Sequence, residues 1–216
     1  MTRSAAFSGK ILVTAGPTVE PLDPVRFISN HSTGTMGYEI AAACARNGFD
    51  VCLVSGPVGL EAPAGVKMVN VLTAREMRRA VVKHLNGCGC IVMAAAVCDF
   101  SPAKKNRSKI KKRETLTLKL RKTPDILAEI RSRRDIAKVG FALETHDALR
   151  NARAKLRAKK LDLIIVNTLD AKSNPFGGGI KKYRILDKDG IIRDFGRITK
   201  KRMASIIARE VKKLLR

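Results

Sequence analysis

The sequence has few aromatic residues: two Tyr, seven Phe and no Trp, together 4% of its 216 residues. Proteins that bind single-stranded nucleic acid commonly stack the bases on aromatic side chains. The shortage therefore argues against that class of protein, and the sequence holds no recognisable nucleic-acid-binding motif.

Long apolar runs are also missing. No run reaches the roughly 18 residues that a membrane-spanning helix needs. Residues 1–9, Met-Thr-Arg-Ser-Ala-Ala-Phe-Ser-Gly, lack the apolar core of a signal peptide. We therefore expect a cytoplasmic protein that does not cross a membrane.

The number of cysteines does not suit a disulfide framework. There are five, an odd number, and most lie in apolar segments: Cys44, Cys52, Cys88, Cys90 and Cys98. Reduced, buried thiols are the expectation for such residues. His84 lies near Cys88 and Cys90, but this spacing is not a usual zinc pattern and no second ligand pair follows.

Two nucleotide-binding fingerprints are absent as well. The loop after the first predicted strand lacks the Gly-x-Gly-x-x-Gly turn of dinucleotide-binding proteins. The Gly-Lys-Ser/Thr of P-loop proteins is also missing. A nicotinamide-dependent reductase is therefore disfavoured.

Positive charge is what the sequence has in excess, with a formal net charge of +24. Residues 1–100 contribute +2 (9 Lys and Arg against 7 Asp and Glu), and residues 101–216 contribute +22 (34 against 12). Such asymmetry suggests anionic ligands and keeps open a non-catalytic, Rossmann-like protein that binds RNA or another polyanion. A basic surface that is merely solvated would explain most of the excess equally well.

Strand-like and helix-like segments alternate through the first 166 residues. Predicted strands cover 11–15, 50–55, 66–71, 90–97, 137–142 and 161–166, and predicted helices cover 36–47, 74–85 and 146–160. Thr73 and Glu76 form a capping box before the second helix. The continuous apolar run 90–97 is typical of a central parallel strand. The alternation predicts an α/β fold: a single-domain, Rossmann-like, doubly wound and mostly parallel sheet over residues 1–216.

The chain after residue 98 departs from this pattern. Residues 99–113 are polar, cationic and without periodicity, and predict a mobile flap. Residues 115–120 predict a half-exposed strand, and Thr123 predicts the cap of a helix with Pro124 at its first position. The last part is predicted to hold a loop, a late β-hairpin and a C-terminal helix, at 173–179, 180–196 and 199–215.

The most informative stretch is the loop after the first predicted strand, residues 14–37. In α/β proteins such loops lie beyond the carboxyl ends of the strands, where ligands bind. Glycines let backbone approach a ligand, and the helix that follows offers free N–H groups and a positive dipole end. We expect Ser32, Thr33 and Gly34 to bind phosphate.

Three polar residues are candidates for chemistry. Asn30 lies in the first loop, Asp99 ends the central strand after Ala95 and Ala96, and Lys109 stands in the cationic flap. An amide can donate to a polarised oxygen, and a carboxylate at a strand end can bind a nucleotide or Mg²⁺. Each also has an ordinary interpretation: a turn asparagine, a cap, or a solvated lysine. The residues alone leave these alternatives open.

Residues 14–37 resemble the first loop of phosphopantothenoylcysteine synthetases, bacterial type, which join cysteine to 4'-phosphopantothenate in coenzyme A synthesis. Arg-Phe-Ile-Ser-Asn-His-Ser at 26–32 matches that loop almost residue for residue. Further matches are Ala-Ala-Val-Cys-Asp at 95–99, Lys-Ile-Lys-Lys at 109–112, Pro-Asp-Ile-Leu at 124–127 and Gly-Phe-Ala-Leu-Glu-Thr at 140–145. The resemblance covers nearly the whole chain.

The resemblance implies a role for each of these residues. Asn30, Arg26 and Lys109 would be catalytic: the asparagine handles an acyl-nucleotide and the lysine closes over the active site. Asn30, Ala95 and Ala96 would contact the substrate. The implied nucleotide contacts are Ser32, Gly34, Asp99, Lys109, Pro124, Asp125, Ile126, Leu127, Phe141, Lys155 and Lys159. Lys155 and Lys159 would share a helix face, where they could equally be surface charges, and Asn167 also fits an asparagine of the family.

The resemblance also implies a two-step reaction. The carboxylate of 4'-phosphopantothenate attacks the α-phosphate of CTP and releases pyrophosphate, and the amine of cysteine then displaces CMP from the acyl-cytidylate. ATP, used by eukaryotic relatives, is the less favoured nucleotide. Mg²⁺ is expected to be held through the triphosphate, a homodimer joined by the late hairpin and flap is expected, and nucleic acid is not.

Three positions and the start of the chain depart from the family's pattern. Cys98 replaces an alanine, and Thr33 and Thr35 differ from the usual Ser and Lys, which leaves the details of phosphate binding open. Many bacterial relatives carry a flavin-dependent decarboxylase before this domain. Nothing before Lys10 resembles one, so we expect a ligase that binds no flavin.

Overall fold

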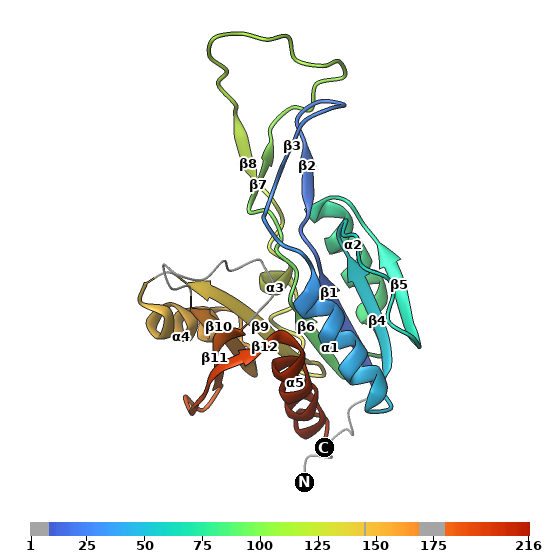
Figure 1. The fold of residues 1–216 in the computed structure, drawn as a ribbon, viewed down its shortest axis with the longest axis vertical. Helices are drawn as coiled ribbons and strands as arrows, with labels where there is room; N and C mark the ends of the chain where they lie inside the picture. Colours follow the sequence, from blue (N-terminus) through green and yellow to red (C-terminus); the bar gives the residue numbers. More distant parts are fainter. Residues whose placement is uncertain (1–8, 145, 169–179) are drawn as a thin grey trace.

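An eight-stranded sheet forms the centre of the computed structural model, which describes residues 9–144, 146–168 and 180–216 (Figure 1). Its strands are β1 (Lys10–Ala15), β4 (Asp50–Ser55), β5 (Val66–Asn70), β6 (Cys90–Met93), β9 (Ala137–Glu144), β10 (Leu163–Thr168), β11 (Ile180–Asp187) and β12 (Ile192–Thr199). They lie side by side in the order β12-β11-β10-β9-β6-β1-β4-β5. The loop predicted at 173–179 lies outside the described residues.

The pairing of the strands confirms the predicted fold class. All neighbours from β5 to β10 are parallel, and β11 and β12 continue the sheet as an antiparallel hairpin. The chain builds outward from β1 to β5 and then returns to start the other half with β6. Because the strand order reverses between β1 and β6, a crevice is expected at the carboxyl ends of these two strands.

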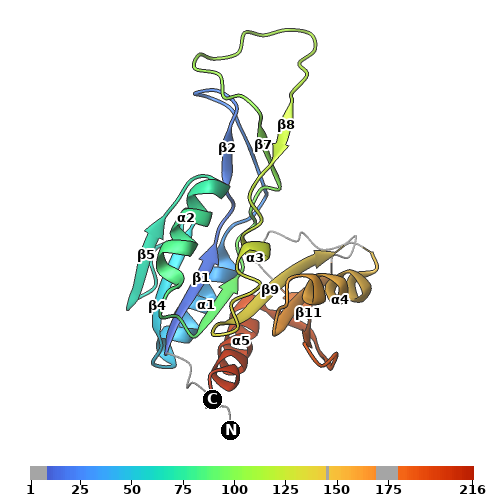
Figure 2. The same ribbon diagram turned by 180° about the vertical axis from the view of Figure 1, so that it is seen from behind.

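The apolar runs of the sequence become strands buried on both faces of the sheet. In β1, Ile11 and Val13 pack into one core and Leu12 packs into the other, since alternate side chains of a strand point to opposite faces. Helices cover both faces: α1 (Thr35–Arg46) and α5 (Lys200–Leu214) on one, and α2 (Ala74–Leu85), α3 (Ile126–Glu129) and α4 (Ala148–Ala158) on the other. Figure 2 shows the second face, with α2 and α4 in front of the sheet.

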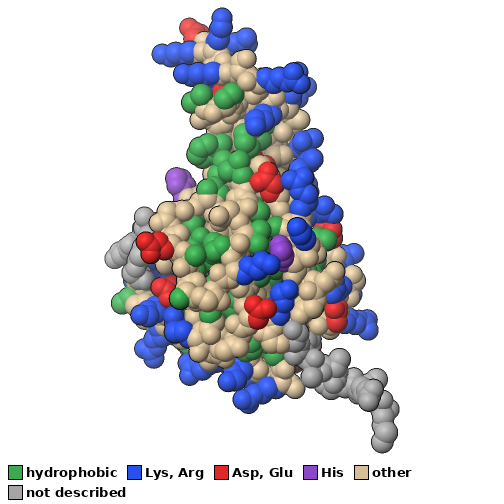
Figure 3. Space-filling view, turned by 90° about the vertical axis from the view of Figure 1, so that its right-hand side faces the viewer, with side chains coloured by type: hydrophobic (Ala, Val, Ile, Leu, Met, Phe, Trp, Pro, Cys, Tyr) green, Lys and Arg blue, Asp and Glu red, His purple; other side chains and the backbone are tan. Residues whose placement is uncertain are grey.

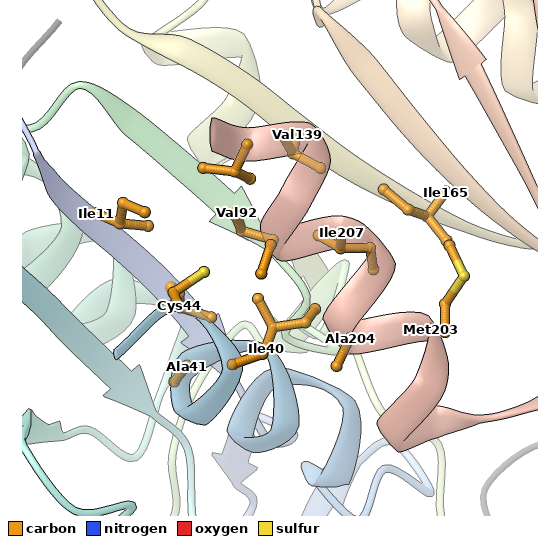
Figure 4. Packing of buried hydrophobic residues seen from close by; sticks show 14 of the residues in the cluster. Ile11, Ile40, Ala41, Cys44, Val92, Val139, Ile165, Met203, Ala204 and Ile207 are labelled. Atoms are coloured by element: carbon orange, nitrogen blue, oxygen red, sulfur yellow. The ribbon is translucent and has the colours of Figure 1, made fainter. Parts of the chain in front are cut away.

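The core under α1 and α5 shows how closely the two helices pack. Figure 4 shows Ile40 of α1 beside Ala204 and Ile207 of α5, and Cys44 of α1 toward Ile11 of β1, with Val92 of β6 pointing from the sheet toward the helices. These side chains are at most a few per cent exposed. Burial of an aliphatic side chain of this kind contributes about 1.5–3 kcal/mol to folding.

Helix starts were predicted with mixed success. The capping box of α2 is present, because the Thr73 side chain accepts from Glu76 N–H and the Glu76 carboxylate accepts from Thr73 N–H. The cap predicted at Thr123 is wrong. Asp125 caps α3 instead, and the Thr123 hydroxyl donates to the carbonyl of Cys98.

The central strand is shorter than its apolar run. A strand over 90–97 was predicted, but β6 ends at Met93. The next residues turn onto the first loop: Ala95 N–H donates to Thr14 Oγ1 (3.2 Å) and Ala96 N–H donates to Gly16 O (2.9 Å). Small side chains permit this approach of two backbones.

Two short hairpins stand out from the sheet as an arm, which we define as residues 19–29 and 100–122 (Figure 1). The first pairs β2 (Val19–Pro21) with β3 (Phe27–Ser29), and the second pairs β7 (Phe100–Pro102) with β8 (Leu120–Lys122). The predicted strand at 115–120 is therefore wrong except for its last residue. The flap predicted at 99–113 is wrong at both ends: residues 100–102 form β7, and the connection between β7 and β8, which we call the flap, covers residues 103–119.

No helix in the described ranges is both long enough and apolar enough to span a bilayer.

Gly56, directly after β4, is where the first loop crosses the sheet most closely. A Cβ atom added there would lie 1.7 Å from the carbonyl oxygen of Pro17. We predict that Gly56→Ala lowers the free energy of unfolding by about 1–3 kcal/mol, because backbone must shift to admit the methyl group. Urea denaturation measures this. Gly59→Ala, where nothing lies within 4 Å of the added atom, is the control, and equal midpoints for the two variants would contradict the prediction.

Candidate active site

A cleft of about 760 Å³ opens beside the carboxyl end of β6. Its walls come from the segment after β6, the base of the arm, the start of α3, β9 and α4. The cleft brings together many residues that the sequence analysis singled out: Ala95, Asp99, Pro124, Asp125, Ile126, Leu127, Phe141, Lys155 and Lys159. Other lining residues were missed: Met93, Val97, Phe100, Lys122, Thr123, Ala154 and Ala158.

Helix α4 and the residue that follows it supply the two lysines of the cleft. Lys155 and Lys159 are four residues apart, while Ala152 and Leu156 are buried against the sheet. Ala154 and Ala158 precede the lysines by one position each, so the same helical spacing could have identified them. Their small side chains leave room for a ligand over this part of the helix.

Lys155 is largely withdrawn from solvent. Its Nζ donates to the carbonyl oxygen of Phe141 at 2.8 Å. Burial lowers the pKa of this lysine, although the nearby carboxylates of Glu144 and Asp99 favour its charged form. A cation that has already lost part of its hydration gains more from pairing with an anionic ligand than a solvated lysine does.

Asp125 combines two roles at the start of α3. Its Oδ1 accepts from Ala128 N–H at 2.9 Å, and its Oδ2 forms an ion pair with Lys159. Burial opposes ionisation of Asp125, but the hydrogen bonds from Lys159 and Ala128 outweigh it and lower the pKa of the carboxyl group. The aspartate therefore holds Lys159 at the edge of the cleft.

Asn30 lies next to the cleft, at the crevice between β1 and β6. Its Nδ2 donates to the carbonyl oxygen of Ala96 at 3.0 Å and to Cys98 Sγ at 3.9 Å. Cys98 is itself fixed, because its N–H donates to Thr18 Oγ1 at 2.9 Å. Neither Asn30 nor Ala96 lines the cleft, but Ala96 directly follows the lining residue Ala95, so the asparagine is hydrogen-bonded one residue away from the cleft wall.

The start of α1 lies in the same crevice and suits an anion. Gly34 is the N-cap residue with a left-handed φ of 74°, and a Cβ there would lie 2.9 Å from Val58 Cγ1. No side chain caps this helix, and its first turn holds no acidic residue. Ser32 Oγ accepts from Gly34 N–H at 3.3 Å. Neither Ser32 nor Gly34 is among the residues that line the cleft.

Arg26 and Lys109 lie in the arm rather than in the cleft. Arg26 pairs with Asp23 (3.3 Å) and donates to the carbonyl of Ile110. Lys109 is exposed and shares a hollow of about 470 Å³ with Arg26. Sequence spacing could not place these residues, because the arm carries them away from the sheet.

Asn167 and the cysteines complete the predicted set. Asn167 lies in β10 with its Oδ1 buried and without a hydrogen-bond partner. All five cysteines are buried and free, as predicted. The described part of the chain holds no group of three or more His, Cys, Asp or Glu side chains that could bind a metal ion.

Comparison with known proteins identifies the family. The model of the DNA/pantothenate metabolism flavoprotein C-terminal domain matches residues 7–215. The chain belongs to this family. The predicted relationship to phosphopantothenoylcysteine synthetases is thereby confirmed.

The curated relatives agree with this assignment. The chain is 41% identical to the coenzyme A biosynthesis bifunctional protein CoaBC of Bacillus subtilis over 212 residues, 96% of this chain and 52% of that protein. It is 45% identical to CoaBC of Escherichia coli K12 over 186 residues, 83% of this chain and 46% of that protein. A cysteine/cysteine sulfinic acid decarboxylase of an unknown prokaryotic organism is 40% identical over 206 residues, with 94% and 57% covered. The chain thus spans about half the length of the curated relatives it matches.

Solved structures confirm the fold. The C-terminal domain of CoaBC superposes with a TM-score of 0.83 and 34% identity, covering 98% of both chains. A Cab2 mutant in complex with phosphopantothenate-cysteine is 21% identical with a TM-score of 0.77, covering 96% of this chain and 87% of the other. At that identity the second structure supports the fold alone.

Proposed function

We propose that this chain is a phosphopantothenate–cysteine ligase, which joins L-cysteine to 4'-phosphopantothenate in coenzyme A synthesis. One observation carries the proposal beyond family membership. Asn30 donates to Ala96, and the preceding residue, Ala95, lines the cleft that holds the two lysines, so a hydrogen-bond donor for an acyl oxygen lies beside a site for a nucleotide. The assembly stands at the reversal of strand order, where α/β sheets bind ligands.

In the first step the cleft holds the nucleotide, the substrate carboxylate attacks its α-phosphate, and the bond to the β-phosphate breaks so that pyrophosphate leaves. Lys155 and Lys159 offset the phosphate charge, because both ammonium groups stand on one wall of the cleft. Asp99, exposed at the cleft, supplies a carboxylate oxygen of the kind that binds Mg²⁺ together with phosphate oxygens. The protein's contribution to such phosphoryl chemistry is positioning and charge stabilisation.

In the second step the amine of cysteine attacks the acyl carbon and the nucleoside monophosphate leaves. An amide NH₂ group has two donor hydrogens. One hydrogen of Asn30 donates to the carbonyl of Ala96 and fixes the side chain. The other donates over a long distance to Cys98 Sγ (3.9 Å) and can exchange that contact for the acyl oxygen, whose developing negative charge it then stabilises.

The reaction can be tested directly. Purified protein would be incubated with 4'-phosphopantothenate, Mg²⁺ and either CTP or ATP, with and without cysteine. We expect pyrophosphate release with CTP and a cysteine-dependent ligation product, with less of both from ATP. Absence of pyrophosphate with both nucleotides would contradict the proposal. Salt-sensitive RNA binding in a filter assay would then favour the polyanion-binding alternative.

Asn30→Ala separates the two steps. We expect pyrophosphate release to persist and formation of the ligation product to fall by about 100–1000-fold, as for loss of one oxyanion donor. Rapid-quench measurement of the acyl-nucleotide and of the final product would show accumulation of the former. His31→Ala, at the next exposed position, is the control. If the rates of pyrophosphate release and of product formation fall equally in Asn30→Ala, the proposed role of Asn30 as a hydrogen-bond donor to the acyl oxygen is contradicted.

We also propose that the ligase acts as a homodimer, as its family resemblance implies. The arm exposes Phe27, Phe100, Leu116 and Leu120, each about half exposed, and the late hairpin exposes Ile180 and Ile191. Figure 3 shows hydrophobic side chains along the length of the arm. Contiguous apolar surface of this kind commonly marks an interface. Sedimentation equilibrium should give twice the mass of one chain, and a single-chain mass at micromolar concentration would contradict this.

A further inference from the structure

One residue in the part of the arm between β7 and β8 differs from its neighbours. Of residues 103–122, all of which the structure describes, only Ile110 is not classed as exposed. It follows Lys109, and its backbone is held at both polar groups. Ile110 N–H donates to Asp23 Oδ2 at 3.0 Å, and the Arg26 guanidinium donates to Ile110 C=O.

The groups that hold Ile110 come from the turn between β2 and β3. Asp23 Oδ1 accepts from Val25 N–H and Arg26 N–H, both at 2.8 Å, and so shapes the turn itself. Its Oδ2 faces Ile110 and lies 3.3 Å from Arg26 Nε. Oδ1 therefore stabilises the turn, and Oδ2 binds the backbone of the flap.

Asp23 is buried although the arm around it is exposed. The residue is 2% exposed, and its side chain is fully covered. Burying a carboxylate is costly unless its charge is matched by donors. The N–H of Ile110 contributes most, ahead of those of Val25 and Arg26, to lowering the pKa of this carboxyl group despite its burial. Because its strongest donor comes from the flap, Asp23 stabilises the contact between the flap and the turn as well as the turn itself.

The β2–β3 turn is also close in sequence to the candidate catalytic residues, because Arg26 lies in it and Asn30 follows β3. From Arg26 the chain runs through β3 directly to Asn30. A third contact, Asn106 N–H to Leu22 O at 2.9 Å, joins the flap to the turn on the other side of Lys109. Lys109 is thus bracketed by two attachments to the hairpin that leads to Asn30.

We propose that Asp23 is a positioning residue for Lys109: by holding Ile110 to the β2–β3 turn, it fixes where the flap lysine can act. This inference rests on the proposed ligase function and on the catalytic role that the family resemblance implies for Lys109. Asp23 touches neither nucleotide nor substrate and acts through the flap backbone.

The variant Asp23→Asn isolates the contact. Asparagine keeps one oxygen for Val25 and Arg26 and places an NH₂ donor opposite the N–H of Ile110. We expect kcat for pyrophosphate release to fall about tenfold, as for loss of a hydrogen bond to a charged group, with little change in the KM for CTP. Trypsin should cut the flap about tenfold faster, because its local opening is easier. The exposed Asp189→Asn, in the turn between β11 and β12, is the control and should change neither.

A double-mutant cycle with Lys109→Ala distinguishes positioning from a general loss of stability. If Asp23 acts through Lys109, adding Asp23→Asn to Lys109→Ala should cost less than a further twofold in kcat. An independent tenfold loss in the Lys109→Ala background would overturn the inference, and so would unchanged flap cleavage in Asp23→Asn. The cleavage assay does not depend on enzymatic activity, so it tests whether Asp23 holds the flap even if the wild-type protein proves inactive. An inactive wild-type protein would contradict the proposed ligase function and not the contact between Asp23 and the flap.

If Asp23→Asn lowers the melting temperature of the whole protein, Asp23→Ser replaces it. A serine hydroxyl can still accept within the turn but has no second oxygen for Ile110. The same tenfold loss of kcat in a serine variant of normal melting temperature would support the inference, and wild-type kcat there would overturn it.

Discussion

One backbone pairing, just beyond the carboxyl ends of the central strands β1 and β6, organises the site. Pro17 and Ala96 form a parallel bridge, with Ala96 N–H donating to Gly16 O and Thr18 N–H donating to Ala96 O at 3.2 Å. This pairing prolongs the contact between β1 and β6 after both strands have ended. It places the first loop against the segment that leads to Asp99, and the carbonyl of Ala96 then orients Asn30.

The strands of the sheet could be predicted from the sequence because burial on both faces demands continuous apolar runs. The Thr73 and Glu76 capping box was visible for a similar reason: local hydrogen bonds need only local sequence. The end of β6 was not predictable from its composition, since Ala94 to Val97 are apolar whether or not they stay in the sheet. Their partner, the first loop, is about 80 residues away in sequence.

The candidate site was predicted in part. Residues of the cleft were named through family motifs, and the structure gathers them around one cavity. The β2–β3 hairpin was missed because its three-residue strands are too short to show alternation, and the turn between them was not recognised as structured. Consequently nothing in the sequence analysis pointed to Asp23 or placed Lys109 in an arm. The structure also locates part of the charge asymmetry: residues 103–122 hold ten Lys and Arg and one Glu, and Figure 3 shows Lys and Arg side chains at the end of the arm and along one side of it.

Burial of the cysteines has a consequence for a protein that we propose to handle free cysteine. Disulfide exchange proceeds through the thiolate, so a thiol that stays protonated reacts slowly with cystine or other oxidised partners. Burial raises the pKa of Cys44 to about 12 and that of Cys88 to about 11, and it also raises the pKa of Cys98 beside Asn30. A thiol held protonated in this way, above all Cys98 beside Asn30, would form mixed disulfides with the proposed substrate only slowly.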